Sequence, residues 1–196
     1  MLMKERPKYR RIIDAAVDVI AEHGFHRAQV SKIAKKAGVA DGTIYLYFKN
    51  KEDILISLFR EKMGQFIEKI QDEIRDKPTI FEKLETMVNV HFSQLALDKN
   101  MAIVTQLELR QTNKNLRLKI NESLKGYLAV IDQIVEQGKR DGVFRASIDT
   151  RLARQMIFGT LDETVTNWVM NDHKYDLVAL AKPVTELLIN GLSAHA

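Results

Sequence analysis

Hydrophobic residues recur three and four positions apart along most of the chain, with polar residues between them. This spacing is typical of amphipathic α-helices, and no segment shows a convincing strand pattern. The pattern that begins near residue 8 stops at Gly24, and the next one stops at Gly38, in the position of a helix C-cap. We therefore expect helices at about residues 8–23, 30–37, 43–48, 51–75, 79–97, 100–111, 115–139, 149–171 and 175–192.

These elements predict an all-α fold of about nine helices in two parts. Three short helices precede residue 50, and longer ones follow it. The helix at 51–75 is long enough to link two bodies. We therefore expect a three-helix domain at residues 1–50 and a larger helical domain at residues 51–196. Pro183 is expected to kink the final helix, and the glycines of GKRDGVFRAS, Gly138 and Gly142, mark the longest loop.

The segment GTIYLYFKNKED contains three aromatic rings and ends among lysines. Stepping 100° per residue places Phe48 only about 40° from Ile44, so both side chains should point inward. Thr43 and Tyr47 then face outward, with Tyr45 on a flank where its hydroxyl can reach a phosphate. Two short helices about a turn match the helix-turn-helix, whose second helix enters the major groove of DNA.

The ends of these helices also carry signals. Asn50 is placed to cap the helix that follows, with Asp53 three residues on as an acidic variant of the capping box. Gly42 leaves room for close backbone approach at a helix N-terminus, where free N–H groups attract an anion. Asp41, or else the backbone alone, would cap that helix.

Positive charge is concentrated at the N-terminus. Residues 1–51 hold eleven Lys and Arg against five Asp and Glu, although the net charge of the whole chain is only +4. Such asymmetry predicts a polyanionic partner, the alternative being a solvated basic face. The chain has no cysteine, no signal-peptide pattern and no apolar run long enough to span a membrane. We therefore expect a soluble, cytoplasmic protein that does not bind membranes.

The run VSKIAKKAGVADGTIYLYFKNKEDIL resembles the DNA-binding segment of TetR-type bacterial repressors, with their I-A-x-x-A-G-V turn and G-x-[IL]-Y-x-[YH]-F-x-x-K pattern. The resemblance implies that Thr43, Tyr45 and Tyr47 contact DNA and that Lys51 meets a phosphate. The chain departs from the pattern at Gln29, where Thr or Ser usually caps the helix and where Ser31 can take part of that role. It departs again at Asp41, in place of a neutral or basic residue. The full candidate DNA-binding set is Ser31, Lys32, Gly42, Thr43, Tyr45, Tyr47 and Lys51.

The larger domain carries polar groups at core-like spacing among aliphatic residues. Basic side chains in such surroundings suit an anionic head group with an apolar tail, although most such groups are on the surface or satisfied within a core. The runs VTQLELRQTNKNLRLKINESLKGYL and ARQMIFGTLDETVTNWVMNDHKYDL resemble the sensor domain of TetR-type fatty-acid-degradation repressors of Gram-positive bacteria. The resemblance implies a long-chain acyl-CoA effector that releases the repressor from its operator, and no cofactor. The candidate ligand-binding residues are Gln106, Arg110, Tyr127, Arg154 and Trp168.

The resemblance also implies a homodimer formed by the last two long helices. Gly159 lies inside one of them, and a mid-helix glycine, which costs about 1 kcal/mol relative to alanine, suggests close helix–helix approach. A two-fold dimer reads a near-palindromic DNA operator. We expect the ligand to favour a state in which the helix at 51–75 holds the two DNA-binding domains at the wrong separation.

Two alternatives remain open. One is an enzyme with Glu108, Asp162 or Glu163 as a general base, but no nucleophile or phosphate loop accompanies these carboxylates. His23 and His26 are the only histidines close in sequence, and Gly24 at a helix end separates them, so no metal site is expected. The other alternative is a TetR-type repressor of an efflux or other operon that responds to a different hydrophobic ligand, for which Glu108 and Glu163 could meet a cation.

Overall fold

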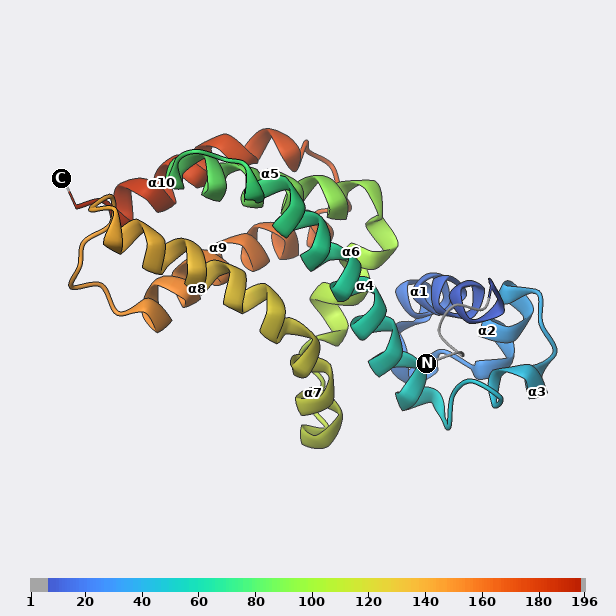
Figure 1. The fold of residues 1–196 in the computed structure, drawn as a ribbon. Coiled ribbons are helices and arrows are strands. Elements are labelled where there is room, and N and C mark those ends of the chain that lie inside the picture. The colour runs from blue at the N-terminus through green and yellow to red at the C-terminus, as the bar shows by residue number, and fades with distance from the viewer. Residues whose placement is uncertain (1–6, 195–196) are drawn as a thin grey trace. The chain divides into compact units, whose positions relative to one another are not determined.

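The computed structural model describes residues 7–194 and confirms the all-α architecture. The described chain contains no β-strand, and only one isolated antiparallel bridge joins Phe144 to Ser193. Figure 1 shows the order of the helices along the chain. The α-helices are α1 (Pro7–Arg27), α2 (Val30–Ala37), α3 (Asp41–Ile44), α4 (Lys51–Arg75), α5 (Ile80–Leu97), α6 (Lys99–Glu108), α7 (Lys114–Asn121), α8 (Lys125–Arg140), α9 (Thr150–Met170) and α10 (Ala181–Leu192), with 3₁₀ turns η1 (Glu122–Leu124) and η2 (Val178–Leu180).

The chain folds into two compact units, each made of two separate segments. Unit 1 comprises residues 1–63 and 99–123, so it contains α1–α3, the first half of α4, α6 and α7. Unit 2 comprises residues 64–98 and 124–196, with the rest of α4, α5 and α8–α10. These structural units are not the functional division at residue 50, which stays a prediction.

In unit 1, α1 packs against both α2 and α6. The hydrophobic stripe predicted for the first helix supplies this core, with Ile12, Ile13 and Ile20 almost completely buried. Gly24 interrupts the helical geometry with a positive φ of 71°, as its predicted role of a stop requires, although one more turn follows it within α1. The apolar face of the first helix is therefore shared between α2 and a helix that lies some eighty residues later in the sequence.

Unit 2 is a bundle in which α8 packs on α9 and α10 packs on α5. Thr79 begins α5 with a complete capping box, because its hydroxyl accepts from the N–H of Glu82 and the Glu82 carboxylate accepts from Thr79. Tyr127 and Phe92 are among the largest fully buried side chains of the unit.

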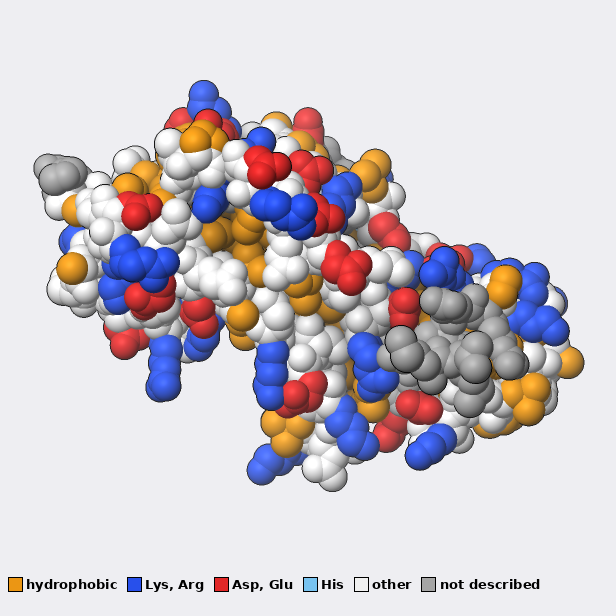
Figure 2. Space-filling model, in the orientation of Figure 1, with side chains coloured by type: hydrophobic (Ala, Val, Ile, Leu, Met, Phe, Trp, Pro, Cys, Tyr) orange, Lys and Arg blue, Asp and Glu red, His pale blue; other side chains and the backbone are white. Residues whose placement is uncertain are grey.

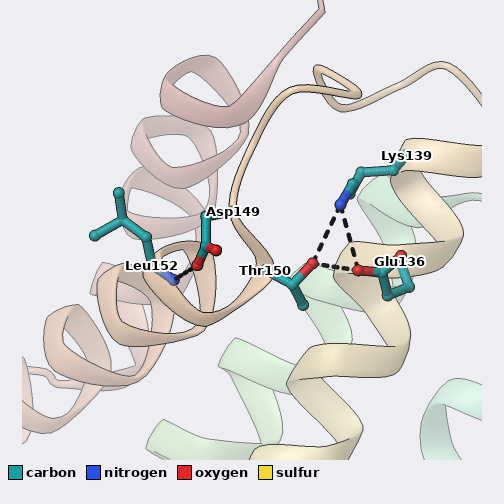
Figure 3. Close-up of polar contacts among 5 residues, drawn as sticks. All are labelled: Glu136, Lys139, Asp149, Thr150 and Leu152. Atoms are coloured by element: carbon teal, nitrogen blue, oxygen red, sulfur yellow. Dashed lines mark hydrogen bonds and ion pairs between the residues drawn. The ribbon is translucent and has the colours of Figure 1, made fainter.

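The loop between α8 and α9 is fixed by polar contacts that Figure 3 shows. Lys139 Nζ lies 3.3 Å from Glu136 Oε1 and 3.2 Å from Thr150 Oγ1, and the Thr150 hydroxyl also donates to Glu136. Asp149 caps α9 by accepting from the N–H of Leu152 at 2.9 Å. The hydroxyl of Thr150, followed by Lys139, lowers the pKa of Glu136. The start of α9 is thus tied to the end of α8.

Three local predictions were wrong. The expected helix at 115–139 is divided into α7 and α8 by η1. Gly138 lies inside α8 rather than in the loop, and the buried ring of Phe144 occupies the space where its Cβ would be. Pro183 does not kink a long helix; it lies in the first turn of α10, where proline is tolerated because its missing N–H would have no intrahelical partner.

Candidate nucleic-acid interface and ligand site

The turn between α2 and α3 has the predicted helix-turn-helix geometry. Gly38 adopts the left-handed conformation with φ 65°, and its N–H bonds back to the carbonyls of Ala34 and Lys35. The N–H of Val39 also bonds to the Ala34 carbonyl, at 3.0 Å. Gln29 precedes α2 without a side-chain capping hydrogen bond. The sharp end of α2 is therefore provided by glycine, as expected.

The segment after α2 buries Ile44 and Phe48, as predicted. The helix itself is shorter than expected, because α3 ends at Ile44 and the chain continues as a turn. The 100° step no longer applies beyond that point, and the predicted placement of the tyrosines was wrong. Tyr45 is 60% exposed, whereas Tyr47 is half-buried with its ring 6.1 Å from that of Tyr9.

The remaining candidates on this face are accessible. Ser31, Lys32 and Gly42 are exposed, and Thr43 is half-buried at the centre of α3. A Cβ at Gly42 would have no atom within 4 Å, so the backbone there is open to close approach. Asp41 is the first residue of α3 and makes no capping bond, so the backbone alone begins the helix. Figure 2 shows hydrophobic side chains exposed near α3, with Lys and Arg beside them.

Lys51, the first residue of α4, is held by the end of α1. Its Nζ donates to the carbonyl of Phe25 at 2.9 Å and to that of His26 at 2.8 Å, and it lies 4.7 Å from the centre of the Phe25 ring. Asn50 caps α4 as predicted, by accepting from the N–H of Asp53 at 2.8 Å. The Asp53 carboxylate accepts from the N–H of Lys49. Lys51 therefore has a structural role, and its contact with phosphate stays a prediction.

Glu108 is a residue whose structural role the sequence did not reveal. It ends α6, is only 8% exposed, and its Oε1 accepts from the N–H of Phe25 at 2.8 Å. The Gln111 side chain donates to its other oxygen. The N–H of Phe25 thus meets a carboxylate, and the carbonyls of Phe25 and His26 meet Lys51. The positive φ of Gly24 breaks the helical geometry of α1 at this point, and the N–H of Phe25 bonds to Glu108.

Unit 1 also contains a cavity of about 440 Å³ between the first half of α4 and the α7–η1 segment. Its lining includes two basic side chains, Arg60 and Lys119, and two acidic ones, Asp53 and Glu122. None of the predicted ligand-binding residues lines it. The lining residues are Asp53, Ile56, Arg60, Lys119, Glu122 and Ser123.

The structure divides the predicted ligand-binding residues between the two units. Gln106 and Arg110 belong to unit 1, where Gln106 is buried and the exposed Arg110 donates to its carbonyl at 3.2 Å. Tyr127, Arg154 and Trp168 belong to unit 2. That all five contact a ligand stays a prediction.

Each candidate of unit 2 has its own protein partner. Arg154 pairs with Asp132 at 2.7 Å, and the Trp168 indole donates to the carbonyl of Tyr175 at 2.9 Å. Tyr127 Oη lies 2.8 Å from Nδ1 of His91. Arg154 and Trp168 therefore stabilise the fold in this conformation, and Tyr127 belongs to a buried polar pair that the sequence did not identify.

Residues 7–194 include no group of three or more His, Cys, Asp or Glu side chains that could hold a metal ion. No helix among the described residues is both long and apolar enough to cross a membrane.

Comparisons with known proteins place both parts of the chain. Residues 12–58 match the family described as "Bacterial regulatory proteins, tetR family", and residues 59–191 match "YsiA-like protein, C-terminal region". The "Fatty acid metabolism regulator protein" of Bacillus subtilis is 66% identical over 191 residues, which cover 97% of this chain and 98% of the relative.

Solved structures agree with these matches. One is the transcriptional regulator FadR from Bacillus subtilis in complex with stearoyl-CoA, and another is the fatty acid degradation regulator FadR from Bacillus halodurans. Each is 67% identical with a TM-score of 0.91, over 94% of this chain and 99% of the other.

Proposed function

Because the chain belongs to the TetR family of bacterial regulatory proteins, we propose that it represses fatty-acid-degradation (β-oxidation) genes and leaves its DNA operator when it binds a long-chain acyl-CoA. The observation that carries the proposal is the likeness over almost the whole chain to a regulator whose structure was solved with stearoyl-CoA. The family description also confirms that the chain is a regulator rather than an enzyme.

The DNA-binding surface that we propose is formed by α2, α3 and the turn after α3. Lys32 gives this face positive charge, and Thr43, Tyr45 and Tyr47 offer hydroxyl groups to bases and phosphates. Ser31 and Gly42 allow the backbone to approach the DNA closely, and Lys51 flanks the surface from α4. A protein with this task acts where the chromosomal DNA is, in the bacterial cytoplasm.

We further propose a homodimer formed through α9 and α10. Leu152 and Met156 on α9 and Leu187 on α10 are exposed, with Leu187 at 73%. Gly191 of α10 lies beside the Met156 side chain of α9, so these exposed apolar side chains belong to neighbouring helices. A two-fold dimer would present its two DNA-binding domains to half-sites about 34–36 Å apart or a multiple of that distance, and the operator would be near-palindromic.

A DNA-release titration tests the effector. An operator fragment would be recovered from genomic DNA by affinity selection with the protein, and its binding followed by fluorescence anisotropy at fixed salt. Stearoyl-CoA should release the fragment, while CoA alone and stearate alone should not. If saturating stearoyl-CoA leaves the operator affinity unchanged, the proposed switch is wrong, because a ligand shifts an equilibrium only by its differential affinity.

Native mass spectrometry of the purified protein separates this function from a repressor that responds to another hydrophobic ligand. A co-purified acyl-CoA supports the proposal, and a different bound compound of high affinity contradicts it.

A further inference from the structure

A polar pair is buried among the aromatic rings of unit 2. His91 of α5 and Tyr127 of α8 are 6% and 1% exposed, and His91 Nδ1 lies 2.8 Å from Tyr127 Oη. The ring of Phe66 stacks on Tyr127 with its centre at 5.7 Å and meets His91 edge-on at 5.4 Å. Phe92 and Phe158 complete the surroundings with edge contacts to His91 and Tyr127. An imidazole and a phenol therefore meet where every other neighbouring ring is apolar.

The pair is neutral but incompletely hydrogen-bonded. Burial lowers the pKa of His91 to about 4 and raises the pKa of Tyr127, so neither is ionised near pH 7. His91 uses Nδ1 for Tyr127, whereas its buried Nε2 pairs with no group among residues 7–194. Because an unpaired buried polar group keeps its desolvation penalty, a hydrogen-bond partner from outside the chain would stabilise this nitrogen.

The tautomer of His91 decides what kind of partner fits. When the Tyr127 hydroxyl donates to Nδ1, the imidazole proton is on Nε2, which then needs a hydrogen-bond acceptor. A carbonyl oxygen bound to an apolar chain would satisfy both the nitrogen and the surrounding rings. In an acyl-CoA, the thioester carbonyl is the only acceptor directly attached to the acyl chain.

Access to the pair lies past partly exposed rings. Phe66 and Phe158 are only half-buried, whereas the rings that they contact, those of His91 and Tyr127, are buried. Figure 2 shows hydrophobic side chains at the floor of a depression near α8 and α9, two of the helices that supply these contacts. An acyl chain that displaced the outer rings would bring its carbonyl towards the polar pair.

We propose that Nε2 of His91 donates a hydrogen bond to the thioester carbonyl of the bound acyl-CoA. Tyr127 acts as a positioning residue that holds the imidazole in the required tautomer. This assignment rests on the proposed function, since it assumes an acyl-CoA effector. It adds His91 to the predicted ligand contacts. It also makes the protein selective for ligands with a carbonyl next to the acyl chain, rather than for any long apolar chain.

The experiment compares two ligands that differ at one group. Stearoyl-CoA carries the thioester carbonyl, and S-octadecyl-CoA has a methylene in its place. Wild-type protein stripped of lipid should bind the thioester about three- to tenfold more tightly in calorimetric titrations, as expected for one hydrogen bond. His91→Phe should reduce this ratio to about one while keeping its affinity for the thioether. That affinity also shows that the variant is folded.

Two further variants keep the test independent of the folding of His91→Phe. His91→Gln retains an amide donor and should keep part of the preference for the thioester. Tyr127→Phe keeps the ring but removes the hydroxyl that selects the tautomer, and should lower the ratio.

The failures of the two proposals are distinguishable. Equal affinities of the wild type for the two ligands, or an unchanged ratio in His91→Phe or Tyr127→Phe, would overturn the role of His91 while leaving acyl-CoA as the effector. If neither compound binds or releases operator DNA, the proposed function fails as well.

Discussion

At the scale of single residues, Lys51 combines a structural contact with a predicted DNA contact. Its ammonium satisfies two carbonyls at the end of α1. Lys51→Ala should therefore lower the free energy of unfolding by about 1.5–3 kcal/mol, the usual contribution of a hydrogen bond to a charged group. If Lys51 also meets a phosphate, the variant should weaken binding to operator and random DNA alike and reduce the salt slope by about one. Thermal unfolding and salt-dependent anisotropy measure the two effects separately.

Lys49→Ala is the matched control for this variant. Lys49 is exposed, and the contact with Asp53 uses its backbone N–H, which the substitution retains. The stability should therefore stay within about 0.5 kcal/mol of the wild type. If Lys51→Ala unfolds at the same temperature as Lys49→Ala, the two carbonyl contacts contribute nothing measurable.

Tyr45 and Tyr47, in the turn after α3, give the second residue-scale prediction. Tyr45 is exposed and Tyr47 packs on Tyr9, so Tyr45→Ala should leave the unfolding temperature unchanged and Tyr47→Ala should lower it. Both should weaken operator binding by about tenfold or more, and random-DNA binding much less, since groove contacts carry the sequence preference. Tyr47→Phe serves as a control that keeps the packing. A loss of equal size on operator and random DNA for both variants would show that the rings contact only the backbone.

The inward residues of this segment could be predicted from the sequence, but the outward ones could not. Ile44 lies in α3 and Phe48 is bonded back to the Ile44 carbonyl, so helical spacing still relates the two. Tyr45 and Tyr47 lie in the turn after α3, where the periodic rule no longer holds. His91 was missed for a different reason: its partner Tyr127 is thirty-six residues away, and no local pattern relates them.

At the scale of helices, Glu108 joins α6 to the end of α1. Glu108→Ala should expose an unpaired N–H at Phe25 and destabilise unit 1 by about 1–3 kcal/mol. Glu108→Gln keeps an oxygen acceptor and should lose less. Hydrogen exchange at residues 24–27 reports the contact directly, and it should become faster in the alanine variant. An unchanged exchange rate at Phe25 would show that the carboxylate does not hold α1.

Helix boundaries were predictable where caps are local. The expected helix at 51–75 agrees with α4 at both ends, and its start is fixed locally because the Asn50 side chain caps it. The break between α7 and α8 was not predictable, since apolar spacing continues through residues 122–124. The two helices belong to different compact units, and packing within each unit overrides the local periodicity.

At the scale of the whole molecule, replacing Gly159 should affect the single chain and the proposed dimer in opposite directions. Within the described chain, a Cβ at this mid-helix position of α9 would have no atom within 4 Å. Gly159→Ala should therefore stabilise the helix itself by about 0.5–1 kcal/mol. If a partner helix lies close to the glycine, the added methyl group should weaken the dimer and, with it, operator binding.

Sedimentation velocity over a concentration series should show a raised dissociation constant for Gly159→Ala, and far-UV circular dichroism at low concentration should show a more stable monomer. Leu187→Glu provides a second disruption, because it places a charge on the exposed apolar surface of α10. Dimers that remain as tight in both variants as in the wild type would mean that α9 and α10 do not form the interface. The half-site spacing would then have to be set by another surface of the chain.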